Sequence, residues 1–219
     1  MKPNVVRALW TATVVLSLIG VAIVIRRMEV LSVAPVGSPR FPERTAMDPG
    51  FARHAVLTRL HILPGLVFIV LGPFQFMRSL RRRRPRLHRL AGRVFVLAGL
   101  VVGATALVMG PQMAIGGANE TAATMLFAVI FLFALLKAFY YIRRGKVALH
   151  REWMIRAYAV GLAVTTIRPI VGVFFATSRL THLTPHEFFG MAFWLGFTMH
   201  LIVAEAWINY TRLAIAGVG

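Results

Sequence analysis

The chain has 219 residues, of which 58% are hydrophobic and only 15% charged, and its formal net charge is +18. A soluble domain is usually about 45–50% apolar and about 25% charged, so this composition argues against a soluble fold. Cysteine is absent, which excludes disulfides, thiolate metal ligands and iron–sulfur clusters. Because the positive charge flanks long apolar runs and does not cover a soluble surface, we expect no nucleic-acid partner.

Several apolar stretches have a length close to that of a membrane-spanning helix. A span needs roughly 20 apolar residues, and in lipid every backbone N–H and C=O must be bonded within its own segment, so each stretch must be a helix. The predicted fold is all-α: a polytopic membrane bundle of six transmembrane helices, forming a single integral membrane domain over residues 1–219. The predicted spans cover about residues 8–26, 56–78, 90–110, 120–142, 153–176 and 187–210.

The first stretch could be taken for a signal peptide, because Lys2 and Arg7 precede it. Its uncharged run of 18 residues exceeds the roughly 7–15 residues of a signal peptide, and Arg26-Arg27 follows it, so we expect a retained span. The outer segment that comes next, residues 28–54, contains four prolines, which exclude a long continuous helix. We expect it to form an extended cap over the outer face.

Two short connections are strongly basic, one from Arg78 to Arg89 and the other from Arg143 to Arg151. Basic loops stay on the cytoplasmic side, so both connections and both chain termini are predicted to be cytoplasmic. Arg26 and Arg27 then fall on the outer side, an exception that the larger basic loops outweigh. The expected partners are the lipid bilayer and, in some interpretations below, other membrane protein subunits.

The fifth and sixth spans have distinctive features. Arg156 and Arg168 interrupt the fifth, which makes it the span least supported by hydropathy. Thr184 and Pro185 are typical of an N-cap and a first helical residue, so the sixth span is predicted to start there.

A short internal similarity links the third and fifth spans. Leu87-His88-Arg89 precedes Arg93 at the start of the third, and Leu149-His150-Arg151 precedes Arg156 at the start of the fifth. This pattern is compatible with two helical hairpins related by a pseudo-two-fold axis along the membrane normal. Chance similarity between two basic loops is the alternative.

Several short elements, distributed from about residue 55 to 210, carry a family resemblance. They are Leu60-His61, Gly65, Gly72–Phe76, Pro85–Arg89, Gly92-Arg93, His150–Arg156, Arg168 and Glu205. Together they resemble the bacterial predicted-membrane-protein family known as domain of unknown function 2306. The resemblance implies a fold and, as an expectation, a place in the bacterial cytoplasmic (inner) membrane. It implies no reaction.

Polar side chains inside predicted spans are costly in lipid and mark candidate sites. An inner group comprises His88 and His150 at one depth, Arg93 and Arg156 deeper, and Glu205 near the inner end of the sixth span. As a cofactor site, the two histidines would be metal ligands of haem b and the arginines would hold its propionates. The site could instead take quinone or another anionic ligand. In a purely structural interpretation, the arginines reach lipid phosphate or pair with Glu205, for which Arg156 is the expected partner.

An outer polar pair consists of His61 and Arg168, both in the outer half of the membrane. The pair could bind an anionic or carbonyl ligand, or it could form a single structural hydrogen bond between helices. His200 lies in the middle of the sixth span, and its depth differs from that of His61 by roughly 10 Å, so we do not expect these two histidines to form a haem pair.

Two hypotheses for function follow, and neither identifies catalytic residues. In the first, the protein is a non-catalytic scaffold or accessory subunit of a membrane complex. In the second, it is a b-type cytochrome-like redox carrier that binds haem or quinone near the cytoplasmic face. Zinc hydrolysis is not supported, since no His-Glu-x-x-His pattern occurs.

Overall fold

The computed structural model describes residues 3–32 and 50–216, and within these ranges the regular structure is entirely helical. Six of the described helices are long and apolar enough to cross a membrane. The predicted fold class is therefore confirmed. The helices are α1 (Pro3–Ser32), α3 (Ala55–Phe76), α4 (Arg78–Arg83), α5 (Pro85–Met113), α6 (Gly117–Arg143), α7 (Val147–Thr181) and α8 (Pro185–Ala216).

The helices extend beyond most of the predicted spans, because apolar runs mark only the part that meets hydrocarbon. The largest differences are in α7, which begins at Val147 and ends at Thr181, and in α1, which continues to Ser32. The outer segment predicted as an extended cap over residues 28–54 is thus helical at its start, and residues 50–53 are helical as well. Residues 33–49 lie outside the described part of the chain.

The turn between α7 and α8 shows how the sequence ends one helix and begins the next. His182 adopts a left-handed conformation with φ 56°, which terminates α7. The Glu187 carboxylate then accepts hydrogen bonds from the Thr184 backbone N–H and hydroxyl, both at 2.8 Å. This arrangement satisfies backbone groups that a helix start leaves unpaired. It confirms the start of the sixth span at Pro185.

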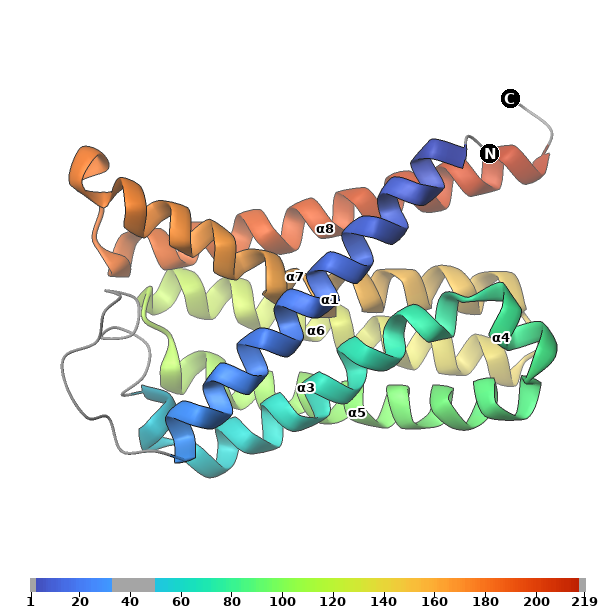
Figure 1. The fold of residues 1–219 in the computed structure, drawn as a ribbon, viewed down its shortest axis with the longest axis horizontal. Coiled ribbons are helices and arrows are strands. Elements are labelled where there is room, and N and C mark those ends of the chain that lie inside the picture. Colours follow the sequence, from blue (N-terminus) through green and yellow to red (C-terminus); the bar gives the residue numbers. More distant parts are fainter. Residues whose placement is uncertain (1–2, 33–49, 217–219) are drawn as a thin grey trace.

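Helix α7 lies at the centre of the bundle and packs against α1, α3, α6 and α8, while α5 packs between α3 and α6. Figure 1 shows α1 crossing this group diagonally. The start of α1, the end of α8 and the basic helix α4 lie at one end of the molecule, and the connection from α5 to α6 lies at the other (Figure 1). The arginine-rich loops and both ends of the described chain therefore share one side of the bundle, as an even number of spans requires.

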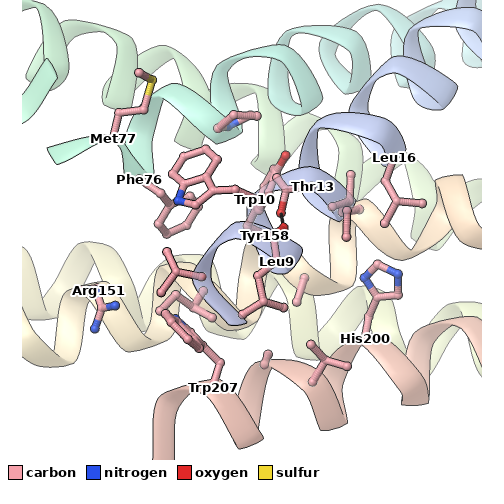
Figure 2. A pocket seen from close by; sticks show the side chains of 18 of the residues that line it. Leu9, Trp10, Thr13, Leu16, Phe76, Met77, Arg151, Tyr158, His200 and Trp207 are labelled. Carbon is pink, nitrogen blue, oxygen red and sulfur yellow. Dashed lines mark hydrogen bonds between the residues drawn. The ribbon is translucent and has the colours of Figure 1, made fainter. Parts of the chain in front are cut away.

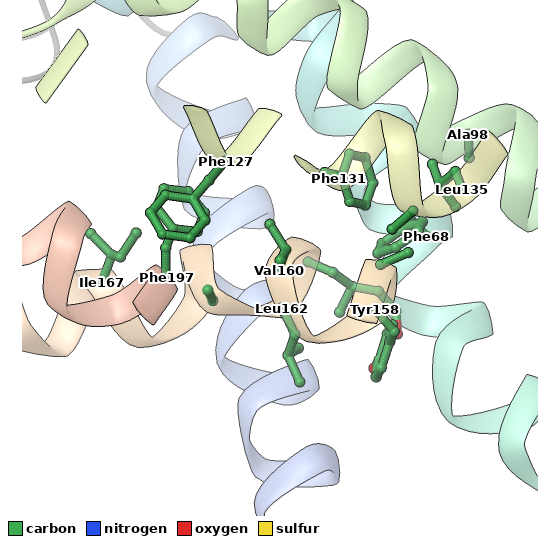
Figure 3. Packing of buried hydrophobic residues seen from close by; sticks show 14 of the residues in the cluster. Phe68, Ala98, Phe127, Phe131, Leu135, Tyr158, Val160, Leu162, Ile167 and Phe197 are labelled. Atoms are coloured by element: carbon green, nitrogen blue, oxygen red, sulfur yellow. The ribbon is translucent and has the colours of Figure 1, made fainter. Parts of the chain in front are cut away.

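The centre of the bundle is an aromatic core formed around Phe68 of α3 (Figure 3). The Phe68 ring stacks on Phe95 at a centroid distance of 4.2 Å and meets the edge of Phe131 at 5.4 Å. Close approach depends on small residues, because a Cβ added at Gly99 would lie 2.8 Å from Leu135 and 3.1 Å from Phe68. This agrees with the general use of glycine where membrane helices pack closely.

Helix α1 is attached to this core through Tyr158 of α7. The Tyr158 hydroxyl lies 3.2 Å from the hydroxyl of Ser17, and its ring fills the space beside Gly72, where an added Cβ would be only 1.9 Å from the ring. At the other end of α1, Arg27 is 5% exposed and lies 3.9 Å above the Phe51 ring. One of the two outer arginines that depart from the positive-inside rule, Arg27, is thus buried within the protein.

Candidate functional site

The five residues of the predicted inner group do not converge on one point. An α-helix turns about 100° per residue, so His150 and Arg156 are separated by roughly 120° around α7. His150 is directed at α6, where its Nδ1 lies 2.9 Å from the Ala138 carbonyl oxygen. Arg156 is directed at α8, where it bonds Glu205. The two residues therefore belong to different helix interfaces.

Arg156 and Glu205 form a bidentate ion pair. Arg156 Nε lies 2.5 Å from Oε1 and its second guanidinium nitrogen lies 2.9 Å from Oε2. The guanidinium also lies over the Trp153 ring at 4.7 Å. Parallel bonds of this kind are the strongest charge pairs available to arginine. Arg156 is the partner that depth along the spans had predicted for Glu205.

A second ion pair between the same helices was missed by sequence reasoning. Arg212 donates to both carboxylate oxygens of Glu152. Glu152 lies one helical turn before Arg156, and Arg212 lies two turns after Glu205, so the two pairs are stacked along the α7–α8 interface. The sequence offered one signal, an acidic residue four positions before an arginine, but Glu152 lies just before the predicted span and Arg212 just after one.

The inner histidines are near one another, but Arg93 is not part of their surroundings. His88 is within electrostatic range of His150. The bond to Ala138 requires His150 to donate its Nδ1–H, which leaves Nε2 as the nitrogen able to accept a hydrogen bond or a metal. Arg93 is exposed on the outside of α5. Its place in the predicted inner group therefore has no support in the arrangement of side chains.

Two polar atoms beside the inner histidines are buried without a hydrogen-bond partner among the described residues. They are Nδ1 of His88 and Nε2 of Gln75. Gln75 is 8% exposed, and its carbonyl oxygen faces Gly92, where an added Cβ would lie 3.1 Å away. Gly92 is one helical turn from His88 on α5, so both atoms lie at the α3–α5 interface. A polar molecule placed there would satisfy them.

The outer polar pair lines an internal cavity of about 240 Å³ in the outer half of the bundle. His61 lies on α3 and Arg168 on α7, and both line the cavity. His61 Nδ1 is 2.8 Å from the Thr105 hydroxyl, which itself lies 2.7 Å from the Val101 carbonyl oxygen. Since Thr105 donates to its own helix, it accepts from His61 Nδ1–H, and His61 Nε2 is left as the acceptor.

The cavity also contains a carboxylate that sequence reasoning overlooked. Glu120 is 7% exposed and lines the cavity beside Arg168, with which it interacts electrostatically. One of its oxygens accepts the Gly116 N–H at 2.7 Å. Glu205 is therefore not the only carboxylate within the predicted spans, because Glu120 lies at the first position of the predicted fourth span. The tight turn before it depends on Gly117, whose φ is +58°.

Apart from these groups the cavity wall is mostly apolar. Seven phenylalanines line it, chiefly from α6 and α8, together with Thr165 and Arg27. A mostly apolar hollow with a few convergent polar groups is the usual form of a small-molecule site. His61, Glu120 and Arg168 therefore make this cavity the best candidate site in the described part of the chain.

His200 belongs to a different opening. Its Nε2 lies 2.8 Å from the Thr166 hydroxyl, and it lines a groove of about 950 Å³ between α1, α7 and α8, shown in Figure 2. His61 lines the internal cavity and not this groove. The expectation that His61 and His200 do not form a pair agrees with this separation.

Comparison with known proteins gives a family for the chain. A family model described as "Predicted membrane protein (DUF2306)" matches residues 58–208. The matched range contains His61, Glu120 and Arg168 and both inner histidines, but not α1, which contributes Arg27 to the cavity. No curated protein and no solved structure matches the chain.

The Arg156–Glu205 pair generates a double-mutant prediction. Either Glu205→Gln or Arg156→Gln leaves one charge without its partner in a bundle surrounded by lipid, so each is expected to lower the free energy of unfolding in detergent micelles. The double variant should be milder than either single one, with a coupling energy on the order of 0.5–3 kcal/mol.

The matched control uses Arg143, an exposed arginine of α6. Combining Glu205→Gln with Arg143→Gln should give additive losses, because these residues share no contact. Additive losses for Glu205→Gln with Arg156→Gln would contradict a stabilising role for the pair.

Proposed function

The chain belongs to the DUF2306 family of predicted membrane proteins, and we propose that it binds a small quinone-type or aromatic molecule with a carbonyl or carboxylate group in the internal cavity. The chain is a multi-pass membrane protein with six candidate spans in contact with lipid. One observation carries the proposal: His61, Glu120 and Arg168 come from three helices into one hollow whose wall is otherwise mostly apolar and includes seven phenylalanines.

The three polar groups define the chemistry that a ligand needs. Arg168 supplies N–H donors and a positive charge, which favour a carbonyl or carboxylate oxygen. His61 Nε2 and the carboxylate of Glu120 are acceptors, which suit a ligand hydroxyl. A quinone-type ring presents a carbonyl in one redox state and a hydroxyl in the other, so it matches both kinds of group. Aromatic rings pack well against the phenylalanine walls.

The size of the cavity limits the ligand. Its volume is about 240 Å³. Ligand pockets usually range from about 300 to 1,000 Å³, so this one suits a single substituted ring.

The inner histidines support a second candidate, the b-type cytochrome-like carrier. A histidine that donates Nδ1–H to a backbone carbonyl holds its ring so that Nε2 is directed at a metal. His150 has this arrangement with Ala138. His88 and His150 are thus the proposed metal ligands if haem b is bound. If neither site binds a ligand, the scaffold or accessory-subunit function remains, for which two stacked ion pairs between α7 and α8 provide rigidity.

We also propose an orientation in the bacterial cytoplasmic membrane, with the end that carries α4 on the cytoplasmic side. The arginine-rich connections and both ends of the described chain lie at that end (Figure 1). The positive-inside rule then places both termini in the cytoplasm.

The cavity proposal predicts saturable binding of a short-chain alkyl benzoquinone to the purified protein. Trp194 adjoins the cavity, since its ring is 5.8 Å from Phe127. A variant that keeps Trp194 as its only tryptophan should show quenching by the quinone. Arg168→Gln should weaken binding about tenfold or more, because a hydrogen bond to a charged group contributes roughly 1.5–3 kcal/mol.

Arg93→Gln is the matched control, since it removes an exposed arginine from the same bundle and should leave binding unchanged. Arg168→Lys keeps the charge and tests whether the loss reflects the guanidinium or the fold. Quenching that does not saturate, or that is equal in Arg168→Gln and Arg93→Gln, would contradict the cavity site.

The haem candidate predicts an absorption spectrum. Protein produced with added haem should show a Soret band and, after reduction with dithionite, a sharp α-band. His150→Ala should remove both, whereas His186→Ala, which changes an exposed histidine, should not. A spectrum without these bands would argue against haem at the inner histidines.

The orientation proposal can be tested with cysteine labelling, because the chain has no cysteine of its own. Ser79→Cys and Lys146→Cys should be protected from a membrane-impermeant maleimide in intact cells, and Thr181→Cys at the other end should react. Lys146 is chosen for the second basic loop because the adjacent Gly145 has a φ of +70°, which disfavours a cysteine side chain. Reaction at Ser79→Cys and protection at Thr181→Cys would reverse the orientation.

A further inference from the structure

The groove between α1, α7 and α8 results from the diagonal path of α1. The second half of α1 is packed against α3 and α7, where Gly20 lies close to Thr165 and Ile69. The first half leaves a gap before α8, and the resulting groove has a volume of about 950 Å³. Figure 2 shows Leu9 and Trp10 of α1 on one side and Trp207 of α8 on the other. The groove is far larger than the internal cavity and separate from it.

Most of the groove is apolar along its length, and two of the polar side chains between its ends, Thr13 and His200, already have partners. The Thr13 hydroxyl donates to the Leu9 carbonyl oxygen of its own helix at 2.7 Å. His200 is bonded to Thr166. The remaining wall between them is aliphatic and aromatic, with Leu16, Ile155, Leu162 and Val203 among its residues. Such a wall suits a hydrocarbon chain.

One end of the groove is strongly cationic. Arg78 and Arg81, three residues apart on one side of α4, line it together with Arg151 of α7. Both α4 arginines are close enough to Arg151 to repel it electrostatically. Among residues 3–32 and 50–216, no carboxylate forms an ion pair with any of the three. The neighbouring carboxylate, Glu152, is bonded to Arg212.

We propose that this groove binds one anionic phospholipid from the leaflet at the arginine-rich end. Its phosphate lies among Arg78, Arg81 and Arg151, and one acyl chain runs along α1, α7 and α8. An anion at this position relieves the repulsion between the guanidiniums, and the apolar wall accounts for the length of the groove beyond them. Basic pockets between membrane helices recognise acidic headgroups through the same combination. A zwitterionic lipid offers no net negative charge to this end.

The headgroup is tested by measuring lipid binding with native mass spectrometry of the full chain. The probes are phosphatidylglycerol and phosphatidylcholine with identical acyl chains. Phosphatidylglycerol should bind preferentially, and the triple variant Arg78→Gln, Arg81→Gln and Arg151→Gln should lose affinity for it by about tenfold or more. The control triple Arg82→Gln, Arg83→Gln and Arg86→Gln removes the same amount of charge from exposed arginines at the same end of the bundle but outside the groove.

The control triple should lose much less affinity than the groove triple. Equal losses in the two triples, or equal binding of the two lipids by the unchanged protein, would overturn the proposal, because either result indicates general attraction to a basic loop. Inorganic phosphate at the same concentration should compete poorly. Full competition by phosphate would show an ion site without a lipid.

The predicted position of the acyl chain is tested with substitutions on the α8 wall of the groove. Val203→Trp adds bulk inside the groove at an exposed position of α8, so the fold should tolerate it. It is expected to reduce phosphatidylglycerol binding several-fold. Ile202→Trp, at the neighbouring exposed position outside the groove, is the control and should have no effect. Unchanged binding in Val203→Trp would place the lipid elsewhere.

Discussion

Lipid provides neither water nor counter-ions, so every charged side chain within the bundle needs a protein partner or a route to the surface. Helix α7 shows how one element meets this constraint in three directions. Its charges toward α8 form ion pairs with Glu205 and Arg212. Arg168 is directed into the internal cavity beside Glu120, and Arg151 lies at the cationic end of the groove. The central position of α7 and its many polar residues are therefore connected, because a helix at the edge of the bundle would have too few neighbours to provide partners for all of them.

The same constraint explains what the sequence could predict. Apolar run length identified the spans, and Thr184-Pro185 marked the start of α8, because both depend on local chemistry. Depth along a helix follows from rise per residue, and depth alone was enough to match Arg156 with Glu205. The fold class and the six long apolar helices were therefore predictable.

Direction around the helix axis was not predictable in the same way. His150 and Arg156 have suitable depths for one site, yet they point to different neighbours. Arg93 has the depth of a buried residue and is exposed. Hydropathy carries no information on which side of a helix meets a given neighbour, since that depends on the packing of all the helices together. Glu120 was missed for another reason: it lies at the edge of an apolar run, where charge is ordinarily assigned to a loop.

Two of the arginines of α7, Arg156 and Arg168, also bear on how the protein is inserted into the membrane. An arginine near the middle of a span raises the free energy of insertion by roughly 2.5–3.5 kcal/mol on translocon-based scales. Arg168 has its carboxylate neighbour, Glu120, on α6, which the ribosome has already completed when α7 emerges. Arg156 has its partner, Glu205, on α8, which has not yet been synthesised. When α7 enters the membrane, the carboxylate beside Arg168 is therefore already present, whereas the ion-pair partner of Arg156 is not. The final position of α7 depends on the insertion of α8.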